Sequence, residues 1–202
     1  MQFITKKFLI ISLVIVLITN LNNSFSYAKS IDDYGIISIM YHRFEENKYP
    51  STNIKIKDFK THIDLIEKSK FKFISHNEFE EAINSKSLEK KILITVDDGF
   101  ISFYNNAWPI LKKKKIPFII FINTETIGSN GYMDWPQIKE ISKFNFVHIG
   151  NHSHSHGYLV DKTDEEIEKD LSTSIKIFKE KLNHETKFFE YPFGEYKKSY
   201  IQ

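Results

Sequence analysis

Short apolar runs alternate with amphipathic stretches along residues 35–202 of the chain. A short run that is apolar throughout and rich in β-branched side chains is typical of a strand buried on both faces. On this basis the sequence predicts strands at 36–40, 71–74, 92–96, 116–122 and 146–149, and a weaker one at 188–191.

Two of the stretches between these runs have the spacing of an amphipathic helix. The first presents an apolar face that runs from Phe59 to Ile66. The second is a shorter helix predicted after Asn77, with Ala82 and Ile83 on its apolar side. Each of these helices would follow a strand and cover one part of a sheet.

The longest helix is predicted to begin at Thr163 and to end at Asn183. Thr163 and Glu166 have the spacing of a capping box, in which each residue satisfies a backbone N–H group of the first turn. The apolar positions recur every three or four residues and predict a core-facing side made of Ile167, Leu171, Ile175, Phe178 and Leu182.

The alternation of strand and helix predicts an α/β fold with a mainly parallel sheet. The pattern does not decide whether the sheet closes into a barrel or stays open. In both cases the functional site is expected at the carboxyl ends of the strands.

The first 28 residues have the features of an export signal. Lys6 and Lys7 precede an apolar run at 8–18, and Ser26 and Ala28 are small residues at the positions that a signal peptidase reads. An uncleaved N-terminal anchor is the alternative. After cleavage no stable membrane span is expected, and the protein would be periplasmic, at the cell surface or extracellular. Residues 29–202 would form one domain.

Composition excludes several classes of protein. The chain has 202 residues and no Cys, so a disulfide framework, a thiolate nucleophile and a Cys-based zinc site are impossible. The formal charge of +2 gives no reason to expect a nucleic-acid partner. With 18 Phe, 10 Tyr and 2 Trp, the chain has ample material for a core.

Two adjacent carboxylates, Asp97 and Asp98, follow the predicted strand at 92–96, and Gly99 allows the chain to turn there. Strand alternation would point the two side chains in different directions, so they can have distinct roles. A solvated Asp-Asp-Gly turn is the alternative.

Three of the eight histidines follow the predicted strand at 146–149. His152 and His156 would share one face if the segment turns helically, whereas His152 and His154 would be paired in an extended segment. Two imidazoles and one carboxylate form a known hydrolytic metal site, and a chain without Cys would favour zinc, cobalt or nickel. A solvated His-rich loop is the alternative.

These elements together resemble the polysaccharide deacetylase family, the NodB-homology domain of carbohydrate esterase family 4. Thr95–Phe100 is similar to its first motif, Thr-Phe-Asp-Asp-Gly, and His152–His156 matches its second, His-Ser/Thr-x-x-His. Pro192–Gly194 matches the end of its third, Arg-x-Pro-Tyr/Phe-Gly. Met40–Phe44 and Tyr191–Glu195 resemble the exported poly-β-1,6-N-acetylglucosamine deacetylase branch.

The resemblance implies a distorted (β/α) barrel that removes N-acetyl groups from an amino-sugar polymer. It assigns the general base to Asp97 and a divalent metal, zinc before cobalt or nickel, to Asp98, His152 and His156. It also implies an oxyanion contact from the backbone N–H near Phe193, with Pro192 and Gly194 at the substrate. His154 is the variable position of the second motif.

The chain departs from the family pattern in two places. The third motif usually opens with an Arg that orients the catalytic Asp, but Glu190 stands there, and Arg43 is the sole Arg of the chain. The family also continues beyond Gln202 with a His that protonates the leaving amine. We therefore expect a domain that is truncated after its third motif. If the chain is complete instead, His42 or His154 would have to act as the acid, or the activity would be low.

Three functions are consistent with these residues. The leading hypothesis is a secreted metal-dependent amino-sugar deacetylase. The second is a carbohydrate- or metal-binding relic of such an enzyme, and the third is an exported metal sensor that uses the His cluster alone. The paired carboxylates favour the first two, because a sensor does not need a base. The oligomeric state cannot be predicted.

Overall fold

A computed structural model describes residues 35–85 and 89–196 of the 202-residue chain. The predicted signal at 1–28 lies outside the described residues. None of the helices in the described ranges has the length and hydropathy needed to cross a membrane.

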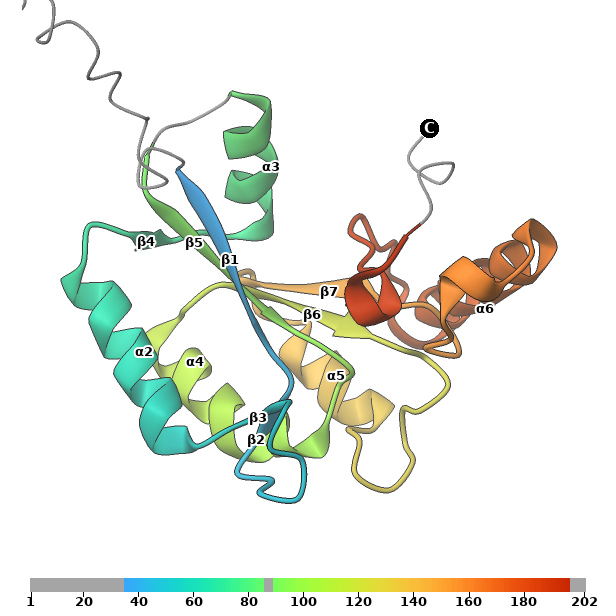
Figure 1. The fold of residues 1–202 in the computed structure, drawn as a ribbon, viewed down its shortest axis with the longest axis horizontal. Coiled ribbons are helices and arrows are strands. Elements are labelled where there is room, and N and C mark those ends of the chain that lie inside the picture. The colour runs from blue at the N-terminus through green and yellow to red at the C-terminus, as the bar shows by residue number, and fades with distance from the viewer. Residues whose placement is uncertain (1–34, 86–88, 197–202) are drawn as a thin grey trace, which may run out of the picture. The chain divides into compact units, whose positions relative to one another are not determined.

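The centre of the fold is a sheet whose strands all run parallel (Figure 1). Its order is β1 (Ile36–Tyr41), β5 (Lys91–Val96), β6 (Phe118–Ile122) and β7 (Val147–Asn151). The short strand β4 (Lys72–Phe73) pairs with the beginning of β5. The predicted α/β class with a parallel sheet is confirmed.

The central strands are buried because both faces of the sheet are covered. On one face Ile92, Ile94 and Val96 join a large core with residues of the helices (Figure 1). This helical layer consists of α2 (Ile56–Lys68), α4 (Trp108–Lys114) and α5 (Trp135–Ile141). The predicted apolar face of α2 is confirmed, since Phe59, Ile63 and Ile66 are its buried residues.

The opposite face of the sheet carries a smaller core around Leu93, Ile119 and Phe121. The helix α3 (His76–Asn84) lies on this side (Figure 1). It begins before the predicted Asn77, because Ser75 and Glu78 form a capping box.

The long helix α6 (Asp164–Leu182) has the predicted ends but only part of the predicted buried face. Thr163 caps its beginning with Glu166, and Asn183 ends it in the left-handed conformation. Its buried residues are Asp170, Ser174 and Phe178, whereas Ile175 is 54% exposed. Phe178 and Leu182 of the predicted face pack in the core, and Ile167 and Leu171 are half-buried. The prediction was wrong for Ile175, because Asp170 and Ser174 turn inward to bind a neighbouring loop.

Short elements connect the layers. The predicted strand at 188–191 is reduced to a bridge between Phe189 and Asn151, the last residue of β7. The other short elements are β2 (Arg43–Phe44), β3 (Asn53–Ile54), the π-helical turn η2 (Phe103–Ala107), and the 3₁₀ turns η3 (Leu159–Asp161) and η4 (Pro192–Gly194).

Candidate metal and catalytic site

The carboxyl ends of three parallel strands supply the site. His42 directly follows β1, and His152 directly follows β7. Asp97 and Asp98 directly follow β5, between the other two strands. These residues border a cavity of about 370 Å³ whose lining is Met40, His42, Thr52, Asp97, Asp98, His152, His156, Glu190, Tyr191, Phe193 and Gly194.

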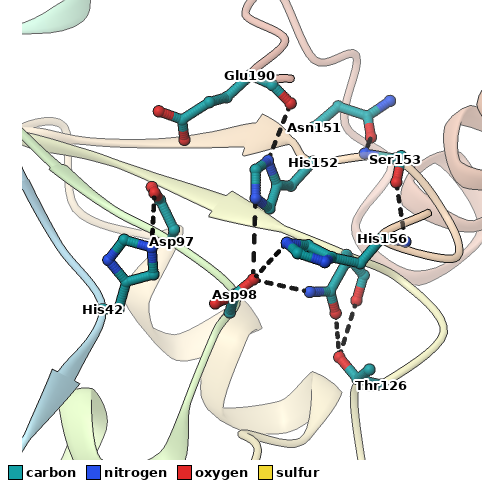
Figure 2. A network of polar contacts seen from close by, with 10 residues as sticks. His42, Asp97, Asp98, Thr126, Asn151, His152, Ser153, His156 and Glu190 are labelled. Atoms are coloured by element: carbon teal, nitrogen blue, oxygen red, sulfur yellow. Dashed lines mark hydrogen bonds and ion pairs between the residues drawn. The ribbon is translucent and has the colours of Figure 1, made fainter. Parts of the chain in front are cut away.

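Asp98, His152 and His156 converge on one point (Figure 2). Asp98 Oδ1 lies 3.2 Å from His156 Nε2 and 3.8 Å from His152 Nε2. Ligands of a tetrahedral zinc ion lie about 3.4 Å apart when each bond is about 2.1 Å long. The three donor atoms therefore fit a divalent metal ion of the zinc type.

The protonation states of these groups also suit a metal. Burial lowers the pKa of His152 to about 4, so its imidazole is neutral near pH 7. Burial alone would raise the pKa of Asp98, but the hydrogen bond with His156 and the electrostatic interactions with the neighbouring imidazoles outweigh it and lower that pKa. A neutral imidazole and an ionised carboxylate are the forms that bind metals.

The backbone carbonyl of Glu190 fixes the tautomer of His152. His152 Nδ1 lies 2.9 Å from this oxygen, which can only accept a hydrogen bond, so Nδ1 carries the proton. The lone pair of His152 is therefore on Nε2, the nitrogen that faces Asp98. Such a support for the second ring nitrogen is usual for metal-binding histidines.

His156 reaches Asp98 by a loop and not by a helical turn. Residues 152–158 are not helical, and Ser153 and His156 have φ values of 69° and 51°. The fully buried Ser153 accepts a hydrogen bond through Oγ from the N–H of His156 at 3.0 Å. The predicted convergence of His152 and His156 is thus reached with a different backbone from the helical one considered.

His154 has another partner. Its Nδ1 lies 2.8 Å from Thr124 Oγ1, and it is not part of the group that converges at Asp98. The alternative pairing of His152 with His154 in an extended segment is not what the structure contains.

Asp97 does not belong to this group of donors, although it lies beside it, and its carboxyl faces His42 and Glu190 (Figure 2). His42 Nε2 is 3.5 Å from Asp97 Oδ2. Asp97 is only 2% exposed, and its Oδ1 has no hydrogen-bond partner among the described residues. Burial raises the pKa of Asp97, and the neighbouring Glu190 and Asp98 raise it further.

Glu190 brings a third carboxylate to the site. Burial raises its pKa, and its Oε2 is buried without a hydrogen-bond partner among the described residues. Oxygen atoms of Asp97 and Glu190 and a nitrogen of His152 also lie within 4.8 Å of one another, as a second group of donors. The position where the family motif has Arg therefore lies beside the expected base, but with a carboxyl group in place of a guanidinium.

Arg43 does not take the place of the missing Arg beside Asp97. Its Nη1 donates to Glu46 Oε2 at 2.7 Å, and its guanidinium stacks on the rings of Phe100 at 3.4 Å and Tyr49 at 4.0 Å. The imidazole of His42 is the basic group that lies next to Asp97.

Phe193 projects over the cavity from η4. Its φ is 63° although it is not Gly, its side chain is 63% exposed, and its ring contacts that of His156 at 4.8 Å. Asp98, Ser153 and His156 also have positive φ. Such unusual backbone conformations cluster at functional sites, which supports a functional role for these three segments.

Asn123 is a site residue that the sequence analysis missed. It directly follows β6, and its Nδ2 donates to Asp98 Oδ1 at 3.1 Å. Its own Oδ1 accepts a hydrogen bond from Thr126 (Figure 2). A polar residue directly after a buried strand was the available signal, the same one that identified Asp97 and His152.

Comparison with known proteins gives the class. Residues 84–202 match the family described as polysaccharide deacetylase, and this is more than half of the chain. The chain belongs to the polysaccharide deacetylase family, as the three motifs predicted.

Two curated relatives are similar over most of this chain. YxkH of Bacillus subtilis, named as a polysaccharide deacetylase, is 27% identical over 160 residues, which cover 78% of this chain and 56% of the relative. The poly-β-1,6-N-acetyl-D-glucosamine N-deacetylase of Staphylococcus aureus is 26% identical over 156 residues, or 70% of this chain and 54% of the relative. The chain thus spans about half the length of the curated relatives it matches.

Solved structures confirm the fold. IcaB from Ammonifex degensii is 27% identical with a TM-score of 0.72, over 82% of this chain and 77% of that chain. The Streptococcus pyogenes deacetylase PplD has a TM-score of 0.74 at 24% identity, over 83% of this chain and 77% of that chain. The sheet is therefore of the NodB type, the distorted barrel that the motifs implied.

Proposed function

We propose that this protein is a metal-dependent N-deacetylase of polysaccharides that contain N-acetylglucosamine, of the poly-β-1,6-N-acetylglucosamine or chito-oligosaccharide type. One observation carries the proposal. Asp98, His152 and His156 converge at one point of a cavity, and a second buried carboxylate, Asp97, lies beside them. The name of the Staphylococcus aureus relative supports the choice of polymer.

Asp98, His152 and His156 would hold the metal ion. Zinc is the first choice and cobalt or nickel the alternatives, because the donors are one carboxylate oxygen and two imidazole nitrogens. A divalent metal supplies Lewis acidity toward the acetamide carbonyl and lowers the pKa of water.

Asp97 would act as the general base. In the reaction, water adds to the acetamide carbon, the C–N bond breaks, and acetate and a free amine are released. Asp97 would accept the proton of the water, and the positive charge of a bound metal would oppose the increase in its pKa caused by burial. The backbone N–H of Phe193 would bind the oxyanion, and Pro192 and Gly194 would shape the adjacent substrate surface.

His42 is the stronger candidate for the acid that protonates the leaving amine. Its Nε2 lies 3.5 Å from Asp97 Oδ2, and its ring lines the cavity. His154 is the weaker candidate, because its Nδ1 is engaged with Thr124. Burial lowers the pKa of His42, although the charge of Asp98 raises it.

We also propose that the protein acts outside the cytoplasmic membrane. The support is the basic start, the apolar run and the small residues within positions 1–28. N-terminal sequencing of the exported protein should find Lys29 as the first residue. An exported chain that begins at Met1 would contradict cleavage and favour an N-terminal anchor.

A binding protein without catalysis is the second candidate, and Glu190 is the observation that favours it. A carboxylate beside Asp97 disfavours the ionised form that a general base needs. Such a relic would keep the metal ligands and lose turnover.

Acetate release separates the two functions. Zinc-loaded protein should release acetate from oligomers of β-1,6-linked or β-1,4-linked N-acetylglucosamine, and Asp97→Asn should lose this activity. Asp164→Asn, a change of an exposed carboxylate at the start of α6, is the matched control and should remain active. A wild-type protein that binds zinc and oligosaccharide but releases no acetate would reject the enzyme and support the relic.

A further inference from the structure

The inward-facing carboxylate of α6 binds the loop that carries the two histidines. Asp170 is 8% exposed. Its Oδ1 accepts the N–H of His154 at 2.6 Å, and its Oδ2 accepts the N–H and Oγ–H of Ser155 at 3.1 and 2.5 Å. All three donors lie between His152 and His156 in the sequence.

A second contact from the same helix holds the beginning of this loop. Ser174 Oγ lies one turn after Asp170 and accepts a hydrogen bond from Asn151 Nδ2 at 2.9 Å. Asn151 Oδ1 in turn accepts the N–H of Ser153 at 2.9 Å. The inner side of α6 therefore binds the loop at two places, and this explains why polar residues occupy a buried helix face.

The loop needs such support because its own backbone is unfavourable. Ser153 and His156 both have positive φ, which costs free energy for residues other than Gly. External hydrogen bonds must outweigh this cost to hold the two imidazoles at one point. A carboxylate suits the task, since it only accepts hydrogen bonds and has two oxygen atoms for three donors.

We propose that Asp170 is a positioning residue that sets the metal affinity of the site by fixing His156 relative to His152. The inference rests on the proposed metal site and extends it to a residue that would not touch the metal. Asp170→Asn replaces one acceptor by a donor that faces backbone N–H groups, so the loop should relax toward an unstrained conformation.

Zinc affinity and the cobalt spectrum test this role. Competition with a chelator should show that the zinc affinity of Asp170→Asn is about 10- to 100-fold lower than that of wild type. This is the usual range for residues that orient metal ligands without touching the metal. The absorption spectrum of the cobalt-loaded variant should also change, because it reports the ligand geometry. Asp170→Glu keeps both acceptors and should recover part of the affinity. Glu168→Gln, on the exposed side of α6, should match wild type.

Wild-type zinc affinity and an unchanged cobalt spectrum in Asp170→Asn would overturn the proposal. If Asp170→Asn does not fold, Ser155→Ala takes its place, because it removes one of the three donors and keeps the carboxylate. Unaltered zinc affinity in that variant would contradict the role equally. A wild type that binds zinc but deacetylates nothing would reject the enzyme alone, whereas a wild type that binds no metal would overturn both proposals.

Discussion

Two groups of histidines lie at the two ends of β7. His152 and His156 follow its carboxyl end, whereas His148 is near its beginning and stacks on His76 of α3, with ring centroids 4.3 Å apart. His184 contacts His148 from the segment after α6 at 5.2 Å. We call His152 and His156 the upper pair and His76, His148 and His184 the lower cluster.

The surroundings of the two groups differ. The upper pair faces Asp98 and opens to a cavity. The lower cluster packs against Phe188, and no metal-binding group of the described residues includes it. His76 Nδ1 and His148 Nε2 are buried without hydrogen-bond partners in the described part of the chain.

The comparison shows what makes histidines of this fold a candidate metal site. Burial lowers the pKa of both His148 and His152, to about 3 and about 4, so neutrality does not separate the groups. The difference is the carboxylate of Asp98, which directly follows β5, together with the cavity that His152 and His156 line. We expect the upper pair to bind metal and the lower cluster to act in packing.

Removal of an upper histidine should give the largest effect. His152→Ala and His156→Ala each delete one of three ligands, so zinc affinity should fall by roughly 10³-fold. His154→Ala and His148→Phe should keep wild-type affinity in the same chelator competition. Equal losses in His148→Phe and His156→Ala would remove the distinction between the two groups.

The adjacent carboxylates should separate turnover from metal binding. Asp97→Asn should lower turnover by about 10²- to 10⁴-fold, the usual contribution of a general base, and keep the zinc. Asp98→Asn should lose the zinc. Metal content by elemental analysis and acetate release by the same preparations measure both. Loss of zinc from Asp97→Asn would show that the two roles are shared or reversed.

The lower cluster should make stability depend on pH. Unfolded imidazole has a pKa near 6.5, whereas burial, with smaller contributions from the charges of His76, His184 and Lys187, lowers that of His148 to about 3 in the fold. Protons therefore bind the unfolded chain first, and stability falls as the pH decreases below about 6.5. Each pH unit down to about 3 would remove up to about 1.4 kcal/mol.

His148→Phe tests this dependence. Urea unfolding of the metal-free protein at pH 7 and pH 5 should show a free-energy loss roughly 2 kcal/mol smaller in the variant than in wild type. Identical losses in the two proteins would mean that His148 is not held neutral by its surroundings, and the contrast with the upper pair would have to be redrawn.

The smallest effect is expected at Asn123. Asn123→Ala removes the N–H that Asp98 Oδ1 accepts, and zinc affinity should decrease by about 10-fold. The exposed Asn145→Ala is the matched control and should show no change. An unchanged zinc affinity in Asn123→Ala would mean that Asn123 does not support Asp98. The residues that support the metal ligands would then be those that hold the histidines and their loop.

The strands and the candidate site residues directly after them could be predicted from the sequence, because both follow from the local pattern of apolar and polar residues. Buried apolar runs became β5, β6 and β7, and the polar residues directly after β5 and β7 met at the site. The ends of α6 were predictable for the same reason, since Thr163 and Asn183 act within one turn of the helix.

Residues that act across the fold were not predictable. Asp170 was not identified from the sequence, because the loop that it binds lies 15 and 16 positions away in the sequence. The buried face of α6 was therefore predicted from the apolar spacing of Ile167, Leu171 and Ile175 and not from Asp170. The backbone at Ser153 and His156 has positive φ values, and Ser and His are not residue types from which such values can be predicted.

The central claim is that Asp98 and the upper pair bind one divalent metal while the lower cluster binds none. Anomalous diffraction at the zinc absorption edge, from crystals of the full chain grown with zinc, tests it directly. The account predicts one peak within bonding distance of Asp98, His152 and His156 in each molecule. A peak at the lower cluster, or none between the three proposed ligands, would contradict it.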